Sequence, residues 1–354
     1  MDDFRSQLSA HAARYPAARM QDFAKLAYQS VFGPGHMIAD RGAALDFLRR
    51  EAEEVSALRQ HDPEEASALR QREPIGGGFL RLCLGAPRDF SLSALAALFF
   101  LSAARTHGSQ ALLDARLEDM EALMRSGVLP REDAWLLAYR AAGCPAVHHS
   151  RAYRRAYRPA YRVVCEDTLR LLPLLRTIDR LLETRETVNV AIEGGSASGK
   201  STLGQALADA YGANLFHMDD FFLRPEQRTP ERFAEPGGNV DHERFARDVW
   251  LPLERNIPFD YRVFDCSRMA LGRIVRVTPA RLRIVEGAYS RHPAFGDPYD
   301  LRIFLGIDPV TQAQRILERS GERLLHRFLN EWIPYENAYF AAFRVIETSD
   351  IVLL

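Results

Sequence analysis

The chain has few cysteines and no long apolar run. Its 354 residues include four cysteines, and no two of them have the C-x-x-C spacing of a zinc or redox motif. A disulfide framework is therefore not predicted, and a reducing cytoplasm is the compartment we expect. The longest apolar run, residues 92–104, is too short to cross a bilayer, and the N-terminus lacks the apolar segment of a signal peptide, so we expect no membrane association.

The chain also lacks an excess of charge of either sign, and it nearly lacks lysine. Its 46 basic residues balance 47 acidic ones, giving a formal net charge of −1. This balance does not favour a membrane or nucleic-acid partner, although a nucleic-acid substrate stays among the alternatives below. Lys25 and Lys200 are the only lysines. The sequence leaves the oligomeric state open, a homo-oligomer included.

The length favours two domains, and the hydrophobic pattern changes once along the chain. Up to about residue 183 the apolar residues recur at helical spacing, which predicts a mainly α-helical domain over 1–183 with one short strand near 78–84. From 184 to 354 strands alternate with helices, which predicts an α/β domain with a doubly wound parallel sheet. The N-terminal helices are expected near 17–32, 41–59, 91–106, 110–126, 131–142 and 166–183. The C-terminal strands are expected at 188–192, 214–217, 282–285, 302–307 and 351–354, with helices at 200–210, 241–254, 309–319 and 331–346.

A complete phosphate-binding motif opens the second domain. Residues 194–201 read Gly-Gly-Ser-Ala-Ser-Gly-Lys-Ser, follow an apolar strand and precede a helix, which is the context that the pattern G-x-x-x-x-G-K-[ST] requires. The loop backbone is expected to surround the phosphates of ATP, with Lys200 on the β and γ phosphates and Ser201 on Mg²⁺. A slim ammonium fits beside bent phosphates where a forked guanidinium does not. The predicted nucleotide-binding residues are Gly194, Gly195, Ser196, Ala197, Ser198, Gly199, Lys200, Ser201 and Thr202.

Acidic and basic residues follow the later strands of this domain. Asp219 follows the second strand, where a substrate hydroxyl would approach the γ-phosphoryl group, and Glu286 ends the third strand as a candidate Mg²⁺ ligand. Arg315, Arg319 and Arg323 recur every four residues and form a candidate lid over the transferring group. Because the lid is short, we expect Arg315 and Arg319, and not Arg323, to contact that group. We predict Asp219, Lys200, Arg315 and Arg319 as the catalytic residues.

The motifs of residues 188–354 together resemble the uridine kinase and phosphoribulokinase family of P-loop kinases, which includes the nicotinamide riboside kinases. The loop Ile-Glu-Gly-Gly-Ser-Ala-Ser-Gly-Lys-Ser and the sequence Met-Asp-Asp-Phe-Phe at 218–222 are similar to motifs of that family. The resemblance implies that Asp219 is the general base that takes the proton of the acceptor hydroxyl, with Asp220 beside it in the acceptor site.

The resemblance extends to the acceptor site. Asn239-Val240-Asp241-His242 is similar to the family motif Asn-Phe-Asp-His, whose Asp grips the ribose of the acceptor. Residues 261–268 are similar to the family stretch Tyr-Asp-Phe-Val-Ser-His-Ser-Arg, which places Tyr261 and Arg268 near the acceptor. Where that stretch has an aromatic residue and a His that read a pyrimidine, this chain has Val263 and Cys266, and a site that loses a hydrogen-bonding partner loses discrimination. Uridine and cytidine are therefore expected to be poor substrates.

Three stretches of the first domain stand out without matching a known motif. The first is the glycine- and proline-containing stretch at 32–37, which ends a predicted helix. The other two are the glycine run at 76–78 that leads towards Arg81, and His148-His149-Ser150 before three Ala-Tyr-Arg repeats. The repeated tyrosines, Tyr153, Tyr157 and Tyr161, would share one face of a helix with arginines beside them. We favour an amphipathic packing face, and the alternative is an aromatic and basic platform for a nucleic-acid strand. His36, His148 and His149 do not have the spacing of a metal site.

The sequence as a whole predicts an ATP- and Mg²⁺-dependent kinase acting on the hydroxyl of a nucleoside-, sugar- or vitamin-like acceptor. Two alternatives stay open. One is a polynucleotide 5′-hydroxyl kinase that uses the tyrosine face. The other is a regulatory nucleotide-binding switch whose helical domain binds a protein partner.

Overall fold

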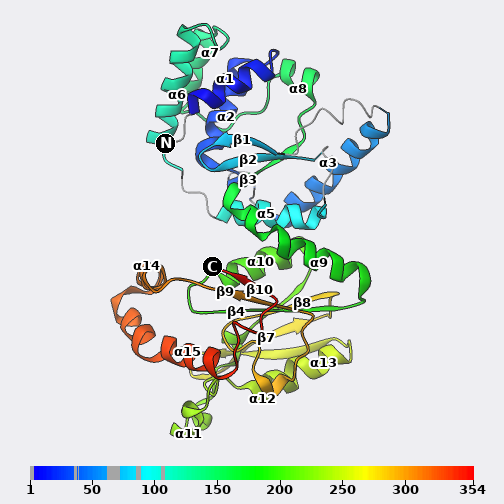
Figure 1. Ribbon diagram of the computed structural model, residues 1–354, viewed down its shortest axis with the longest axis vertical. Coiled ribbons are helices and arrows are strands. Elements are labelled where there is room, and N and C mark those ends of the chain that lie inside the picture. The colour runs from blue at the N-terminus through cyan, green and yellow to red at the C-terminus, as the bar shows by residue number, and fades with distance from the viewer. Residues whose placement is uncertain (1–3, 36–37, 39, 62–71, 85–88, 105–107) are drawn as a thin grey trace. The chain divides into compact units, whose positions relative to one another are not determined.

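The structure is a computed structural model that describes residues 4–35, 38, 40–61, 72–84, 89–104 and 108–354. The chain forms two compact units, residues 1–176 and 177–354 (Figure 1). The division falls within one helix, α9 (Leu172–Thr184), a few residues before the position expected from the sequence.

Unit 1 contains a small antiparallel sheet surrounded by helices. Its strands, β1 (Arg72–Gly76), β2 (Phe79–Cys83) and β3 (Tyr161–Cys165), lie in the order β1-β2-β3. Only the middle strand was predicted. The helices are α1 (Phe4–Arg14), α2 (Met20–Phe32), α3 (Arg41–His61), α5 (Leu92–Ala104), α6 (Gln110–Arg125), α7 (Asp133–Ala141) and α8 (Arg151–Tyr157), with a 3₁₀ segment at Glu166–Leu171.

Hydrophobic patterning explains how the helices pack around this sheet. Helices α1 and α2 contact β1, and their buried residues share a core with α6 and α7. Helix α5 packs against β3 and is apolar on all sides, as expected for a helix that is buried all round. None of the helices in the described part of the chain is long and apolar enough to span a membrane.

The prediction that three tyrosines share one helical face is wrong. Helix α8 ends at Tyr157, because Arg158 adopts a left-handed conformation (φ 40°) and Pro159 follows. Tyr161 therefore lies on strand β3, and Tyr153 is only 2% exposed. A buried tyrosine cannot stack on a nucleic-acid base, so the structure supports the packing interpretation.

Unit 2 has the predicted α/β architecture. Five parallel strands, β4 (Val188–Gly194), β5 (Asn214–His217), β8 (Leu282–Glu286), β9 (Leu301–Leu305) and β10 (Ile351–Leu353), lie in the order β10-β9-β4-β8-β5. The helical segments are α10 (Lys200–Tyr211), α11 (Pro230–Ala234), α12 (His242–Phe245), α13 (Leu251–Glu254), α14 (Pro309–Arg327) and α15 (Ile333–Ala342). Shorter 3₁₀ turns lie at Met218–Phe221, Pro225–Gln227 and Pro293–Phe295, and π-helical turns at Ala246–Trp250 and Phe328–Trp332.

Both faces of this sheet are covered. Helix α10 packs against β4, β5 and β8. Sheet residues that include Ala191, Phe216 and Val285 share a separate core with residues of α12, α13 and α15. An antiparallel hairpin, β6 (Phe259–Asp265) and β7 (Ala270–Val277), adds a two-stranded sheet that the sequence analysis did not predict.

Candidate active site

The phosphate-binding loop connects the end of β4 to the start of α10. Its first residue, Gly194, has φ +143°, and a Cβ there would lie 2.2 Å from the Leu305 carbonyl oxygen of β9, so only glycine fits. Ala197 adopts φ 62°, an uncommon conformation for a residue with a side chain, which indicates that the surrounding structure holds the loop in a defined shape. The loop leads directly into the N-terminus of α10, where unpaired backbone N–H groups favour an anion.

Lys200 lies over this loop. Its Nζ donates a hydrogen bond to the Gly195 carbonyl oxygen at 2.8 Å, which folds the side chain back along the backbone. Burial raises the pKa values of three carboxyl groups, Glu193, Asp219 and Glu336, and the positive charge of Lys200 opposes that rise in each. The second lysine of an arginine-rich chain thus lies close to three acids.

The strand register aligns the residues that follow the loop. On neighbouring parallel strands, Ile192 pairs with Glu286 and His217 pairs with Glu286, so the carboxyl ends of β4, β5 and β8 meet at one edge. Glu286 is buried there, and its Oε1 accepts hydrogen bonds from Ser201 Oγ at 3.0 Å and from His217 Nδ1 at 2.5 Å. The bond to Glu286 raises the pKa of His217. Sequence analysis had not included His217.

Asp219 and Asp220 have different environments. The Asp219 side chain is open to solvent, although nearby protein atoms desolvate it enough to raise its pKa, an effect that Lys200 opposes and Glu286 reinforces. Asp220 is buried and accepts a hydrogen bond from the Tyr261 hydroxyl at 3.0 Å. The geometry therefore suits Asp219 for proton transfer and Asp220 for holding the hairpin strand β6.

Asp241 forms the N-cap of α12. Its Oδ1 accepts a hydrogen bond from the Arg244 backbone N–H at 3.1 Å, and it is 1% exposed. Its Oδ2 accepts no hydrogen bond, although the Nε atoms of Arg224 and Arg244 lie 3.7 and 3.6 Å away. A buried carboxylate oxygen without a hydrogen bond has capacity to bind a ligand hydroxyl.

Glu336 of α15 is the main site residue that sequence analysis missed. Its Oε2 accepts a hydrogen bond from the Ser196 backbone N–H at 2.9 Å, and its Oε1 accepts one from Ser196 Oγ at 2.6 Å. From α14, Gln312 donates to the Ser196 carbonyl at 2.9 Å and Arg315 donates to the Ala197 carbonyl at 3.1 Å. The sequence holds no motif for these contacts, because they join the loop to residues more than 110 positions away.

Glu193 precedes the loop and is fully buried. Its Oε1 accepts hydrogen bonds from the Arg291 backbone N–H at 2.9 Å and from the Tyr339 hydroxyl at 2.8 Å, and its Oε2 has no hydrogen-bond partner. Burial raises the pKa of Glu193 to about 7. Helix α15 thus contacts the loop region twice, through Tyr339 to Glu193 and through Glu336 to Ser196.

The remaining predicted arginines lie at different distances from the loop. Arg315 contacts it, whereas the Arg319 guanidinium lies 5.7 Å from the centre of the Phe328 ring. Between Arg319 and Arg323, Gly321 has φ 76° and ψ 170°, which interrupts α14.

Arg268 is exposed in the β6–β7 turn, where its Nε lies 3.8 Å from Asp265. The acceptor roles of Arg268 and Tyr261 stay predictions.

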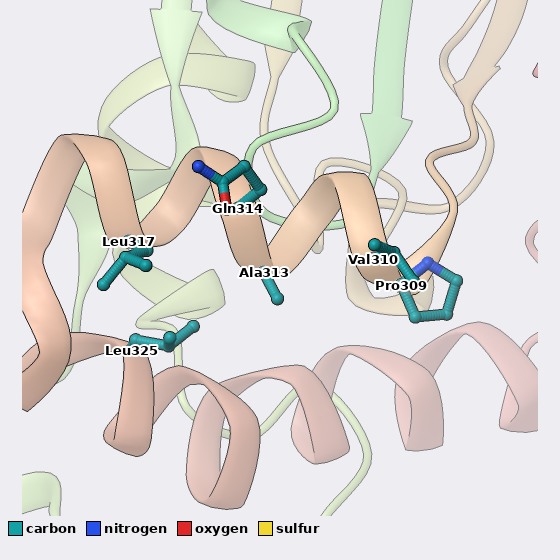
Figure 2. A pocket seen from close by; sticks show the side chains of 6 residues that line it. All are labelled: Pro309, Val310, Ala313, Gln314, Leu317 and Leu325. Carbon is teal, nitrogen blue, oxygen red and sulfur yellow. The ribbon is translucent and has the colours of Figure 1, made fainter.

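An apolar cavity of about 410 Å³ lies along the interrupted helix α14 (Figure 2). Figure 2 shows Leu317 and Leu325, which come from the two halves of that helix, facing each other. The lining residues are Pro309, Val310, Ala313, Gln314, Leu317 and Leu325. None of them carries a charge, so the cavity is not suited to phosphate chemistry.

One known protein is similar to this chain in sequence. A uridine kinase from Geobacillus kaustophilus is 25% identical over 173 residues, which cover 44% of this chain and 81% of that protein. The C-terminal half of the chain resembles uridine kinases. This confirms the resemblance inferred from the motifs. No family model matches the chain.

Two solved structures each match about half the chain. A structure described as a possible uridine kinase from Bacillus stearothermophilus covers 51% of this chain and all of its own, with a TM-score of 0.39 and 20% identity. A candidate fructose transport system kinase from Silicibacter covers 52% of this chain and 98% of its own, with a TM-score of 0.42 and 23% identity.

The oxygen atoms beside the loop fit Mg²⁺. Ser201 Oγ and Glu286 Oε1 are 3.0 Å apart at the mouth of the loop, and hydroxyl and carboxylate oxygens are the ligands that Mg²⁺ takes. Mg²⁺ in nucleotide sites uses few protein ligands together with phosphates and water. In the described ranges, no group of three or more His, Cys, Asp or Glu side chains is placed to hold a metal ion.

Proposed function

We propose that unit 2 transfers the γ-phosphoryl group of ATP to a hydroxyl of a small nucleoside-, sugar- or vitamin-like molecule. The observation that carries this proposal is the position of Asp219. It is open to solvent beside Lys200 and Glu286, at the edge where the phosphate loop lies. A base in that place can take the proton of an incoming hydroxyl as it attacks the γ-phosphoryl group.

The other site residues have separate proposed roles in the transfer. The loop backbone and Lys200 would hold the phosphates, and Arg315, which already contacts the loop, would offset charge on the transferring group. Ser201 and Glu286 would hold Mg²⁺, which neutralises phosphate charge when bound. For the acceptor, Asp241 supplies a buried carboxylate oxygen without a hydrogen bond, which suits a pair of ribose-like hydroxyls.

The acceptor is proposed to be a compound other than uridine or cytidine. The hairpin offers Val263 and the exposed Cys266 where a pyrimidine reader would be needed. A valine makes no hydrogen bond to a base edge, and a thiol makes a weak one. We predict that unit 1 selects the acceptor. We also predict a cytoplasmic location.

Steady-state kinetics with MgATP test the acceptor class. The panel contains uridine, cytidine, other ribosides and free sugars, assayed with the full-length chain. We expect uridine and cytidine to give kcat/KM values below roughly 10⁴ M⁻¹s⁻¹ and at least one other acceptor to exceed them. Efficient turnover of uridine would contradict the proposed specificity. Tight ATP binding without transfer to any acceptor would instead favour the regulatory switch.

A further inference from the structure

Arg244, in the short helix α12, is an arginine buried in unit 2. It is 3% exposed, and its guanidinium carbon lies 4.2 Å from the centre of the Phe221 ring. Burying a guanidinium has a desolvation cost, and apolar side chains of similar volume often replace a buried charge without loss of stability. Stability alone therefore does not explain an arginine at this position, and the groups that it binds indicate a further role.

The guanidinium joins two segments that flank the proposed acceptor site. Its Nη2 donates to the Asp220 carbonyl at 2.7 Å, in the turn Met218–Phe221 that also carries Asp219. Its Nη1 donates to the Arg262 carbonyl at 2.6 Å, in strand β6 of the hairpin. A planar guanidinium fixes the directions of its N–H groups, so these two bonds set the position of the turn relative to the hairpin.

Asp241 is the third group that Arg244 holds. The Arg244 backbone N–H donates to Asp241 Oδ1 at 3.1 Å, and Arg244 Nε lies 3.6 Å from Oδ2. The Asp241 backbone N–H in turn donates to the Phe221 carbonyl at 2.7 Å. Within the described residues, neither Nε nor Oδ2 has a hydrogen-bond partner, so the carboxylate is oriented with one oxygen left for the acceptor.

A buried arginine of unit 1 has different surroundings. Arg81 donates to Gln29 Oε1 at 2.8 Å and to Glu73 Oε2 at 3.3 Å. Both partners are side chains of α2 and β1, so packing within unit 1 accounts for this arginine. His149 is likewise buried and hydrogen-bonded at both ring nitrogens, at 2.8 and 2.7 Å, and His36 lies outside the described residues.

We propose that Arg244 is a positioning residue of the acceptor site, which holds the proposed base Asp219 and the acceptor-binding Asp241 at a fixed separation. This inference rests on the proposed function, because it assigns a role within that site. Each hydrogen bond of Arg244 described above ends on Asp241 or on a residue next to Asp219 or Tyr261. These bonds do not involve the phosphate loop, so Arg244 should affect the acceptor much more than ATP.

Steady-state kinetics of the full-length chain test this role. Arg244→Lys keeps the charge, but one ammonium cannot replace a fork that binds two carbonyls. With MgATP and the best acceptor of the panel above, we expect kcat/KM for the acceptor to fall roughly 10²-fold and the KM for ATP to change by less than about twofold. Normal acceptor kinetics in Arg244→Lys, or an equal loss for both substrates, would overturn the proposal.

Arg283→Lys is the matched control. Arg283 is 4% exposed and donates to the Leu253 carbonyl at 3.0 Å and to Asn256 Oδ1 at 2.6 Å. It lies near the amino end of β8, whereas the site lies at the carboxyl ends of the strands. Both variants should melt at lower temperature than the wild type, but Arg283→Lys should keep normal acceptor kinetics. A similar loss of acceptor kcat/KM in Arg283→Lys would overturn the proposal, because lost stability would then explain both results.

Hydrogen exchange tests the same contacts without an activity assay. Arg244→Lys should raise the exchange of the turn Met218–Phe221, of α12 and of β6 together, and Arg283→Lys should leave these segments protected. Unchanged exchange in the turn and in β6 would overturn the proposal. If the wild type phosphorylates no acceptor, the proposed function fails, whereas hydrogen exchange still decides whether Arg244 holds the three segments.

Discussion

The Glu336 carboxylate binds Ser196 of the phosphate loop through both the backbone N–H and the side-chain hydroxyl. A negative charge thus occupies donors of a loop that serves to bind phosphate. Helix α15 is tied to the loop by this contact, so a nucleotide that competes for those donors would also act on the helix. The relationship joins residues 140 positions apart in the sequence.

Replacing Glu336 by Gln is expected to strengthen nucleotide binding. The amide keeps the shape and one hydrogen bond to Ser196 but removes a charge that repels the γ-phosphate, a gain of about 1 kcal/mol at the edge of a protein site. The KM for ATP should fall roughly fivefold. Glu331→Gln is the matched control, because Glu331 is exposed and pairs with Arg327. An unchanged or higher KM would show that Glu336 supports the loop and does not compete with phosphate.

Replacing Lys200 by Ala is expected to abolish transfer without loss of the fold. The one hydrogen bond of Nζ is to the Gly195 carbonyl, and the side chain supports no core. Activity should fall by at least two powers of ten, as for loss of one electrostatic contact in a transition state, while the melting temperature changes by less than about 2 °C. Lys200→Arg should also be impaired, because the fork does not fit the loop. A folded Lys200→Ala enzyme of normal rate would contradict the assignment.

The two acids after β5 should respond differently to amide substitution. Asp219→Asn removes the proton acceptor, and we expect kcat to fall by two to four powers of ten with little change in stability. Asp220→Asn should have a smaller effect on kcat, since the amide oxygen can still accept from Tyr261. Rates at saturating ATP and thermal melts distinguish the two. The reverse order of effects would assign the base to Asp220.

Glu193 should make stability depend on pH. Its pKa is about 7 in the folded chain and near 4.5 when unfolded, so the folded state holds the proton more tightly. The contribution of Glu193 to the free energy of unfolding is therefore fully present below pH 4.5. It is lost as the pH rises through 7, and the loss is at most about 3 kcal/mol. Glu193→Gln should show no such loss, so its melting temperature should exceed that of the wild type increasingly between pH 5 and 8. A difference in melting temperature between the two proteins that stays constant from pH 5 to 8 would refute this prediction.

Unit 2 could be predicted from the sequence because its signals are local. The apolar run at 188–192, the glycines of the loop and the acids after each strand reflect neighbours in sequence, and the parallel register then aligns them. Glu193 and Glu336 could not be predicted, because burial and long-range contacts define them. In unit 1, β1 was missed because Pro74 weakens its strand signal, and β3 was missed because the repeat spacing placed Tyr161 on a helix with Tyr153 and Tyr157.

The most direct test of the central claim follows phosphorus through one reaction. Full-length protein and its Asp219→Asn variant are each incubated with MgATP and a fractionated metabolite pool, and ³¹P NMR with mass spectrometry identifies new phosphate esters. We predict that the wild type forms ADP and a new phosphate monoester in equal amounts, and that the variant forms neither at a comparable rate. ADP released with free inorganic phosphate, or ester formation equal in both proteins, would contradict a kinase that uses Asp219 as its base.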